Sequence, residues 1–195
     1  MGDDFSLLEE AIGKFVTLTE EETEKLHAVA QLKTVKKGQF LLHEGVHNAN
    51  TFFVNKGCLR TYMVDKSGIE HIMGFSTKGW WAGDLRPFYS NEPGNFYIQA
   101  IIDSNVIVIS KEDREALYHI GVTFERFFRI LAEKAFINLQ DRLLDNVVLT
   151  ALERYKKFID RYPEALQVLP QKQIAAFIGV TPEFLSRAKK KDSTI

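Results

Sequence analysis

The spacing of hydrophobic and polar positions changes twice along this chain. Over residues 6–32 the apolar residues recur every three or four positions, which predicts helices. Between about residues 34 and 110, short runs of β-branched and aromatic residues are separated by glycines, which is typical of a β-sandwich or barrel. Over residues 123–160 the helical spacing returns. The pattern therefore predicts an α+β protein with a strand-rich segment between helical ones.

Local signals sharpen this outline. Thr19 followed by Glu22 is the signature of a capping box, which predicts that a helix begins there. Asp65-Lys-Ser-Gly68 predicts a turn between two strands. The predicted strands are residues 52–54, 59–64, 70–75, 98–102 and 106–109.

The helix predicted over residues 123–160 is apolar on more than one side. Its apolar set is Phe124, Phe127, Phe128, Leu131, Ala135, Leu139, Leu143, Val147 and Leu152. So many apolar positions indicate a helix that packs against more than one surface. We expect one surface to be the strand-rich segment and the other a second copy of the same helix. A helix buried wholly within its own chain is the alternative. Tyr162-Pro163 ends the run, because the residue before proline avoids the α region.

The segment from residue 171 to 187 predicts two short helices around a tight turn. Gly179 stands where the backbone needs a positive φ, and Thr181 followed by Pro182 is a good start for the second helix. Ala175 is small enough to let the two helices cross closely. The spacing of Gln171, Ala175, Gly179 and Leu185 is that of a DNA-binding helix-turn-helix. An ordinary hairpin of two helices is the alternative.

The charge distribution changes this picture only locally. The 195 residues carry a net charge of −1, so affinity for nucleic acid must come from charge separation. Residues 171–195 hold five basic and two acidic side chains, a basic patch that suits phosphates. The alternative is that these lysines only keep a tail soluble.

Other chemistry finds little support in the sequence. The single cysteine, Cys58, excludes an internal disulfide and any site held by several thiolates, and it is consistent with a reducing cytoplasm. Five scattered histidines form no zinc-protease motif, and neither a Ser–His–Asp signature nor a phosphate loop occurs. The acidic N-terminus does not read as a signal peptide, and no apolar run reaches the roughly 18 residues of a membrane span. We therefore expect neither an enzyme nor a membrane protein.

Taken in order, these segments resemble the CRP/FNR-like transcription regulators, the family of the catabolite activator protein. The resemblance rests on the glycine-punctuated motifs at residues 37–45, 52–62, 65–68 and 83–85, and on Arg142-Leu-Leu, Glu153-Arg-Tyr155 and Tyr162-Pro163. It implies an N-terminal β jelly-roll sensor domain of the cyclic-nucleotide-binding type over residues 1–122. It also implies a dimerisation helix over residues 123–148 and a C-terminal helix-turn-helix DNA-binding domain over residues 149–195.

The resemblance also implies a ligand pocket, from which this chain departs. In the family an acidic residue holds the ribose, while an arginine and a small hydroxyl residue hold the cyclic phosphate. Here the acid is Asp84, but the arginine position falls at Gly94, and an anion without a cationic partner is poorly stabilised. Arg86 or Arg60 would substitute only with a different geometry. We expect no binding of cyclic AMP in the family's manner, so the pocket holds another ligand or is closed. The candidate pocket residues are Arg60, Gly83, Asp84, Leu85, Arg86, Gly94 and Asn95.

For DNA, the resemblance points to the second of the two short helices. Glu183 and Arg187 match the family's base-reading positions, where an acid accepts from cytosine and an arginine donates to guanine. Pro182 replaces an earlier arginine of the family, and the sequence ends at Ile195 before any clear wing hairpin. Phosphate contacts are expected from Gln171, Lys172, Gln173, Thr181, Ser186, Lys189 and Lys190.

These observations predict a dimeric, bacterial-type regulator of transcription that binds double-stranded DNA in the cytoplasm. Its implied partners are a second copy of the chain and RNA polymerase, with a small effector that the sequence does not identify. No metal, resident cofactor or membrane partner is expected. The alternative is an effector-binding or protein-interaction module that has lost sequence-specific DNA binding, which Pro182 and the missing wing favour.

Overall fold

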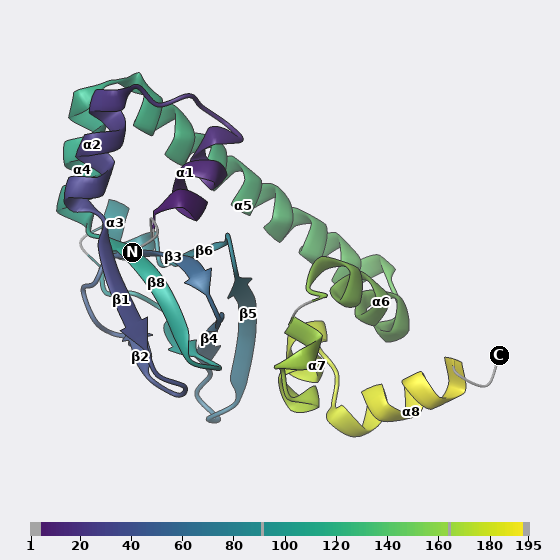
Figure 1. The fold of residues 1–195 in the computed structure, drawn as a ribbon. Helices are drawn as coiled ribbons and strands as arrows, with labels where there is room; N and C mark the ends of the chain where they lie inside the picture. Colours follow the sequence, from purple (N-terminus) through teal and green to yellow (C-terminus); the bar gives the residue numbers. More distant parts are fainter. Residues whose placement is uncertain (1–4, 91, 164, 193–195) are drawn as a thin grey trace.

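The computed structural model describes residues 5–90, 92–163 and 165–192 and contains two four-stranded sheets next to a long helix (Figure 1). The strands are β1 (Gln31–Val35), β2 (Phe40–Leu42), β3 (Thr51–Lys56), β4 (Cys58–Val64), β5 (Glu70–Thr77), β6 (Trp81–Gly83), β7 (Tyr97–Ala100) and β8 (Ser104–Ile109). The sheet orders are β1-β8-β3-β6 and β2-β7-β4-β5, and every pairing is antiparallel. This order is that of a jelly roll, so the predicted sandwich is confirmed.

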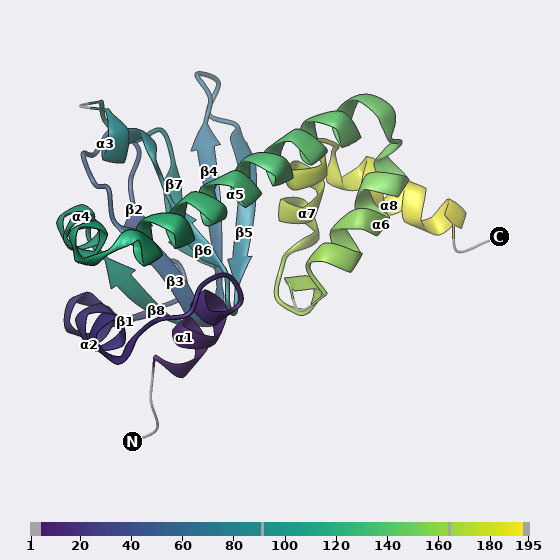
Figure 2. The same cartoon turned by 90° about the horizontal axis from the view of Figure 1, so that it is seen from above.

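The helices lie on both outer faces of the sandwich. They are α1 (Ser6–Gly13), α2 (Glu20–Val29), α3 (Arg86–Tyr89), α4 (Lys111–Ile120), α5 (Val122–Val148), α6 (Ala151–Arg161), α7 (Gln171–Ile178) and α8 (Pro182–Asp192), with a short 3₁₀ turn at Ala165–Gln167. Figure 2 shows α5 running from the first sheet, past β5, to the C-terminal helices α6 to α8. None of the described helices is long and apolar enough to cross a membrane.

Strand alternation produces three separate cores. Phe52 and Val54 of β3 point between the sheets, where they join Leu59, whereas Phe53 points outward. The outward residues of the β1–β8–β3–β6 sheet pack against α1, α2, α4 and the first turns of α5, including the fully buried Phe124. The third core covers the outer face of the other sheet and is formed with the C-terminal helices.

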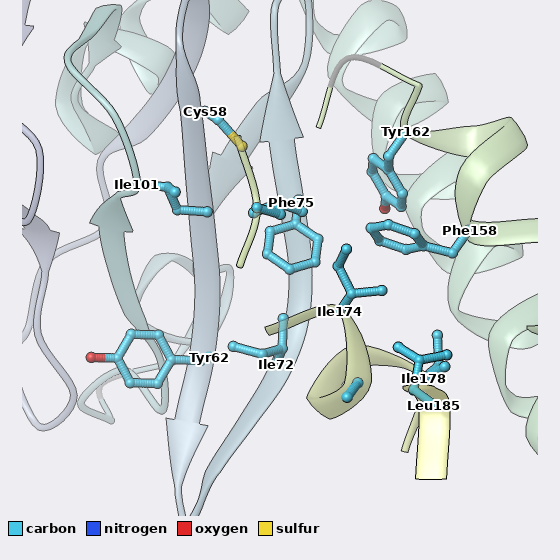
Figure 3. Packing of buried hydrophobic residues seen from close by; sticks show 12 residues of the cluster. Cys58, Tyr62, Ile72, Phe75, Ile101, Phe158, Tyr162, Ile174, Ile178 and Leu185 are labelled. Carbon is cyan, nitrogen blue, oxygen red and sulfur yellow. The ribbon is translucent and has the colours of Figure 1, made fainter. Parts of the chain in front are cut away.

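The third core is built mainly of aromatic side chains. Phe75 of β5 lies 6.0 Å from Phe158 of α6 and 5.5 Å from Phe177 of α7, measured between ring centroids. Figure 3 shows Ile174 of α7 pointing into the same cluster, with Cys58 of β4 at its upper left. The C-terminal helices therefore share a hydrophobic core with the sheet and are not connected to it by a flexible linker alone.

An arginine of α5 joins the sheet to these helices. β5 is an edge strand, and Met73 forms a bulge in it, because Gly74 pairs with Thr61 while Ile72 pairs with the next residue along. The guanidinium of Arg142 donates to the carbonyls of Ile72 and Met73 at 2.7 and 2.5 Å. It also donates to the carbonyl of Phe177 on α7 at 3.1 Å. One side chain therefore bridges three elements.

The secondary structure departs from the sequence prediction in several places. Residues 31 and 32 already belong to β1, and β7 ends at Ala100 instead of residue 102. The unbroken helix predicted over residues 123–160 is wrong, because Thr150 begins a new helix there, and its hydroxyl accepts from the Glu153 amide at 3.3 Å. The predicted capping box of Thr19 and Glu22 is confirmed.

Labelling of Cys58 tests whether Arg142 holds the C-terminal helices on the sheet. Cys58 is fully buried in the third core, and burial raises the pKa of its thiol to about 12, so only an opened state reacts with a thiol reagent. Arg142→Met keeps the apolar stem but leaves three carbonyls without this donor, at a cost of about 2–4 kcal/mol. We expect labelling of Cys58 in that variant to be ~30- to 1000-fold faster than in the parent.

Arg126→Met is the matched control, because Arg126 is an exposed arginine of the same helix. It should leave the labelling rate unchanged. Equal rates in the parent and in Arg142→Met would show that the opening that exposes Cys58 does not depend on Arg142.

Candidate nucleic-acid interface and ligand pocket

The turn between α7 and α8 has the geometry expected from the sequence. Gly179 adopts φ +75°, and the amide of Val180 donates to the carbonyl of Ala175 at 3.0 Å, which closes the end of α7. The hydroxyl of Thr181 accepts from the amide of Phe184 at 3.2 Å and caps α8. Ala175 is fully buried where the helices meet. The predicted pair of short helices around a tight turn is confirmed.

Helix α8 has a buried side and an exposed side. Leu185 is fully buried in the third core, whereas Glu183 and Arg187 are exposed. At 3.6 residues per turn, positions 183 and 187 lie on the side of the helix opposite Leu185. Arg187 forms no ion pair with the described residues, so its guanidinium is available to a partner. Figure 1 shows α8 extending away from the sheets.

The candidate phosphate contacts differ in their exposure. Gln171, Lys172 and Thr181 are exposed, although the Thr181 hydroxyl already caps α8. Gln173 is only partly exposed, and its side-chain oxygen is buried without a donor among the described residues, so it does not suit a phosphate contact. Ser186 is also partly exposed.

The remaining two candidates are the lysines of α8. The ammonium of Lys189 lies 4.9 Å from the ring centroid of Tyr155 on α6, so this side chain packs along the helical unit. The side chain of Lys190 lies outside the part of the chain that the structure describes.

In the candidate ligand pocket, the acidic residue of the turn, Asp84, forms its hydrogen bonds within the protein. Asp84 is buried, and its carboxylate accepts from the amide of Arg86 at 2.9 Å and from the amide of Asn95 at 2.7 Å. The residues that follow Gly83 are thereby tied to the loop before β7. The carboxylate therefore links these two loops, and it is not a free hydrogen-bond acceptor for a ribose.

Gly94 completes this closure. Its amide donates to the carbonyl of Val46 at 3.1 Å, and its carbonyl accepts from Gly45 at 2.9 Å. A Cβ at this position would lie 2.9 Å from Oδ2 of Asp84, closer than ordinary van der Waals contact. The position at which the family carries an arginine thus has no room for one unless Asp84 moves.

The two arginines suggested as substitutes are both engaged. Arg60 donates to the carboxylate of Glu70 at 2.7 Å and to the side chain of Gln99 at 2.7 and 2.9 Å. Arg86 forms an ion pair with Glu92. Leu85 is exposed, and neither it nor Asn95 supplies a charge. The structure brings Asp84, Arg86, Gly94 and Asn95 together, whereas both arginines are paired with acids outside the predicted set.

Sequence reasoning missed the residues that join the domains. Arg142 and Arg154 entered only as parts of family motifs, without any role in joining the helices. Arg154 donates to the carbonyls of Ile178 at the end of α7 and Leu149 at the end of α5, at 3.0 and 2.7 Å. No local signal marks either arginine, because each follows an acidic residue, Asp141 or Glu153, and resembles an ordinary surface charge of a helix. Within the described residues, no group of three His, Cys, Asp or Glu side chains is placed to hold a metal.

Comparison with known proteins agrees with this architecture. The family model of the cyclic nucleotide-binding domain matches residues 32–120. No curated protein sequence matches the chain. The match agrees with the cyclic nucleotide-binding type of fold that the resemblance implied for the N-terminal part of the chain.

Solved structures extend the similarity beyond that domain. FixK2 from Bradyrhizobium japonicum has a TM-score of 0.74 at 23% identity, with 85% of each chain covered. A CRP/FNR-family transcriptional regulator from Eubacterium rectale has a TM-score of 0.73 at 15% identity, covering 98% of this chain and 88% of its own. The catabolite activator protein of Thermus thermophilus has a TM-score of 0.54 at 18% identity, covering 91% of this chain and 84% of its own. The predicted resemblance to CRP/FNR regulators is confirmed, and at these identities it concerns the fold.

The closed pocket predicts that cyclic AMP does not bind. With Asp84 and both arginines engaged, a cyclic phosphate would enter without a free cation to receive it. Calorimetric titration of the full chain with cyclic AMP should show no heat of binding. Micromolar binding would contradict the closed pocket.

A substitution at Gly94 tests the close contact between this residue and the carboxylate of Asp84. Gly94→Ala should cost about 1–2 kcal/mol of unfolding free energy, because the added methyl group presses on the buried carboxylate of Asp84. Gly13→Ala is the control, since a Cβ there would meet no atom within 4 Å. Urea unfolding followed by circular dichroism measures both. Equal stability of the two variants would show that the contact between residues 84 and 94 is not tight.

Proposed function

We propose that this chain is a homodimeric, DNA-binding regulator of transcription whose sensor domain does not use a cyclic nucleotide in the family's manner. The observation that carries the proposal is the outward presentation of Glu183 and Arg187 on α8, opposite the buried Leu185. A helix presented in this way can enter the major groove with its N-terminal residues towards the bases. The likeness in fold to FixK2 and to a CRP/FNR-family regulator supports the same function.

The chemistry of the two outward residues suits base recognition. An arginine can donate two hydrogen bonds to O6 and N7 of guanine, and a glutamate can accept one from the amino group of cytosine. Lys172 and Gln171 lie exposed at the start of α7, where the amides of a helix N-terminus favour a phosphate. The proposal therefore assigns base reading to α8 and backbone contacts to the start of α7.

Pairing of two copies is proposed through α5. The second half of this helix carries large apolar side chains on its surface, with 59% of Phe136 and 78% of Val147 exposed. The exposed set is Phe136, Ile137, Leu139, Leu143, Leu144, Val147 and Val148. At 3.6 residues per turn these side chains fall within about half of the helix circumference.

An apolar face of this extent on a surface helix indicates an interface with another molecule. The long helix of a second copy is the simplest partner, because a two-fold axis brings identical faces together. The dimer would present two copies of α8 to DNA. We therefore expect an operator of two inverted half-sites about 34–36 Å apart, one turn of DNA.

Gel-shift titration tests the DNA contacts. A duplex selected from a random pool by the parent protein should bind the Arg187→Ala variant ~5- to 150-fold more weakly, since a bidentate contact with guanine contributes about 1–3 kcal/mol. The same variant should lose its preference at one base pair of each half-site. Lys172→Gln should weaken binding to all sequences and reduce the slope of affinity against salt.

Arg126→Ala, a change of an exposed arginine outside α7 and α8, serves as the control and should bind DNA as the parent does. Failure of the parent to select any duplex would favour the alternative, an effector-binding or protein-interaction module without sequence-specific DNA binding. Unchanged binding by Arg187→Ala would contradict the assignment of that residue.

Sedimentation or light scattering tests the pairing. Leu143→Asp places a charge in the centre of the proposed apolar interface and should weaken dimerisation ~30- to 1000-fold. Ile69→Asp is the matched control, because Ile69 is an equally exposed apolar residue in the turn between β4 and β5. A parent protein that is monomeric at micromolar concentration would rule out this dimer.

A further inference from the structure

A large cleft lies between α5, the β5–β6 edge of the jelly roll and the C-terminal helices. Its volume is about 1030 Å³, the size of a site for a small organic molecule. Figure 2 shows α5 spanning this region from the first sheet to α6. The cleft is lined by residues of both the sheet domain and the C-terminal helices, including Gly83 at the rim of the closed pocket and Phe177 of α7.

The walls of the cleft are largely apolar. Trp80 and Trp81 line it from the sheet domain, and they are the only two tryptophans in the sequence. Phe127 and Leu131 of α5 and Phe177 of α7 line it from the other elements. Partly exposed aromatic rings around a cavity favour the body of an apolar or aromatic ligand.

The charges that line the cleft favour an anion. The basic side chains are Lys14, Lys134, Arg142, Arg154, Lys157 and Arg161, and the acidic ones are Asp141, Asp145 and Asp160. Asp145 is already paired with Lys157 at 2.6 Å. Arg161 lies 5.4 Å from the centroid of Trp80 and forms no ion pair with the described residues. The guanidinium groups of Arg142 and Arg154 are bonded only to backbone carbonyls among those residues.

We propose that this cleft binds an organic anion with an apolar body, an aryl or medium-chain aliphatic carboxylate, whose acid group pairs with Arg161. The guanidinium of Arg161 is exposed to an incoming ligand and can form charge-assisted, bidentate hydrogen bonds with a carboxylate, while the aromatic walls receive the apolar part. The site differs from the pocket of the family in its elements and its chemistry. It draws on α6 and on Trp80, and it needs neither Asp84 nor Gly94.

The position of the cleft gives the ligand a regulatory consequence, which rests on the proposed function. One wall belongs to the sheet domain and another to the helices that carry α8, so the ligand binds tightly only to one arrangement of the two. The apolar face of α5 used for pairing lies on the other side of that helix from Asn138 and Arg142, which line the cleft. Leu139 is the one residue of the exposed apolar set that also lines the cleft, so dimerisation would cover only one edge of it.

Titration with matched probes tests the binding directly and without DNA. 4-Phenylbutyrate is added to the full chain, followed by calorimetry and by the emission of Trp80 and Trp81, which both line the cleft. 4-Phenyl-1-butanol is the uncharged analogue, and decanoate distinguishes an aliphatic from an aryl acid. We expect at least one acid to change the emission and to bind at least about tenfold more tightly than the alcohol.

Variants locate the site. Arg161→Gln should reduce the preference for the acid over the alcohol to below about threefold. Asn138→Phe fills the cleft from α5 without adding a tryptophan and should abolish binding of acid and alcohol alike. Arg126→Gln, which changes an exposed arginine outside the cleft, should leave both affinities unchanged. Circular dichroism establishes that each variant is folded.

The proposal is overturned if neither acid is preferred to the alcohol, or if folded Asn138→Phe binds the acid as the parent does. These outcomes do not depend on the gel shifts. A chain that binds no DNA can still bind the acid, and a DNA-binding dimer can lack the site, so the two proposals fail separately.

Discussion

The position of the C-terminal helices depends on one partly buried guanidinium group. An edge strand leaves carbonyls without partners, and the bulge at Met73 adds another that no ladder hydrogen bond can reach. Arg142 satisfies these carbonyls and that of Phe177 together, while its guanidinium lies 4.3 Å from the centre of the Phe177 ring. Because a buried acceptor without a donor is costly, the edge of the sheet and the end of α7 are both tied to the same point on α5. The aromatic core around Phe75 packs beside the same junction.

Helix α5 consequently has two faces with different tasks. The face that carries Arg142 packs on the jelly roll over the first turns of α5 and lines the cleft over the later turns. The opposite face, around Leu143 and Val147, remains apolar and exposed. A rotation of the C-terminal helices about Arg142 would change the width of the cleft while leaving the exposed face in place. In a dimer of the proposed kind, such a rotation would alter the spacing of the two α8 helices.

Local signals in the sequence were sufficient to predict helices and strands, but not the contacts that join them. The capping box at Thr19 and the left-handed Gly179 were predictable, because each depends on a few neighbouring residues. The three-residue strands β2 and β6 were not, since strands so short carry no periodicity and exist only through their partners. The periodicity missed the break at Thr150 because the apolar spacing continues across it, and only the family resemblance ended the helix at residue 148. Thr150 and Glu153 form a capping box of the same kind as at Thr19. The role of Arg142 depends on a bulge in a strand some 70 residues away, which no local pattern reveals.

The candidate pocket shows a second limit of prediction from the sequence. The sequence predicted the loss of the phosphate-binding arginine at Gly94, but not the new use of Asp84. Once no side chain occupies position 94, the carboxylate can approach the backbone of that loop, where it accepts from Asn95. The two changes therefore support each other: the glycine makes room for the carboxylate, and the carboxylate holds the glycine's loop closed. In the proposed function, the closed jelly roll forms one wall of the cleft and takes no cyclic nucleotide. A signal to α8 would then enter where the two domains meet, and both tryptophans and the arginines that have no carboxylate partner among the described residues lie there.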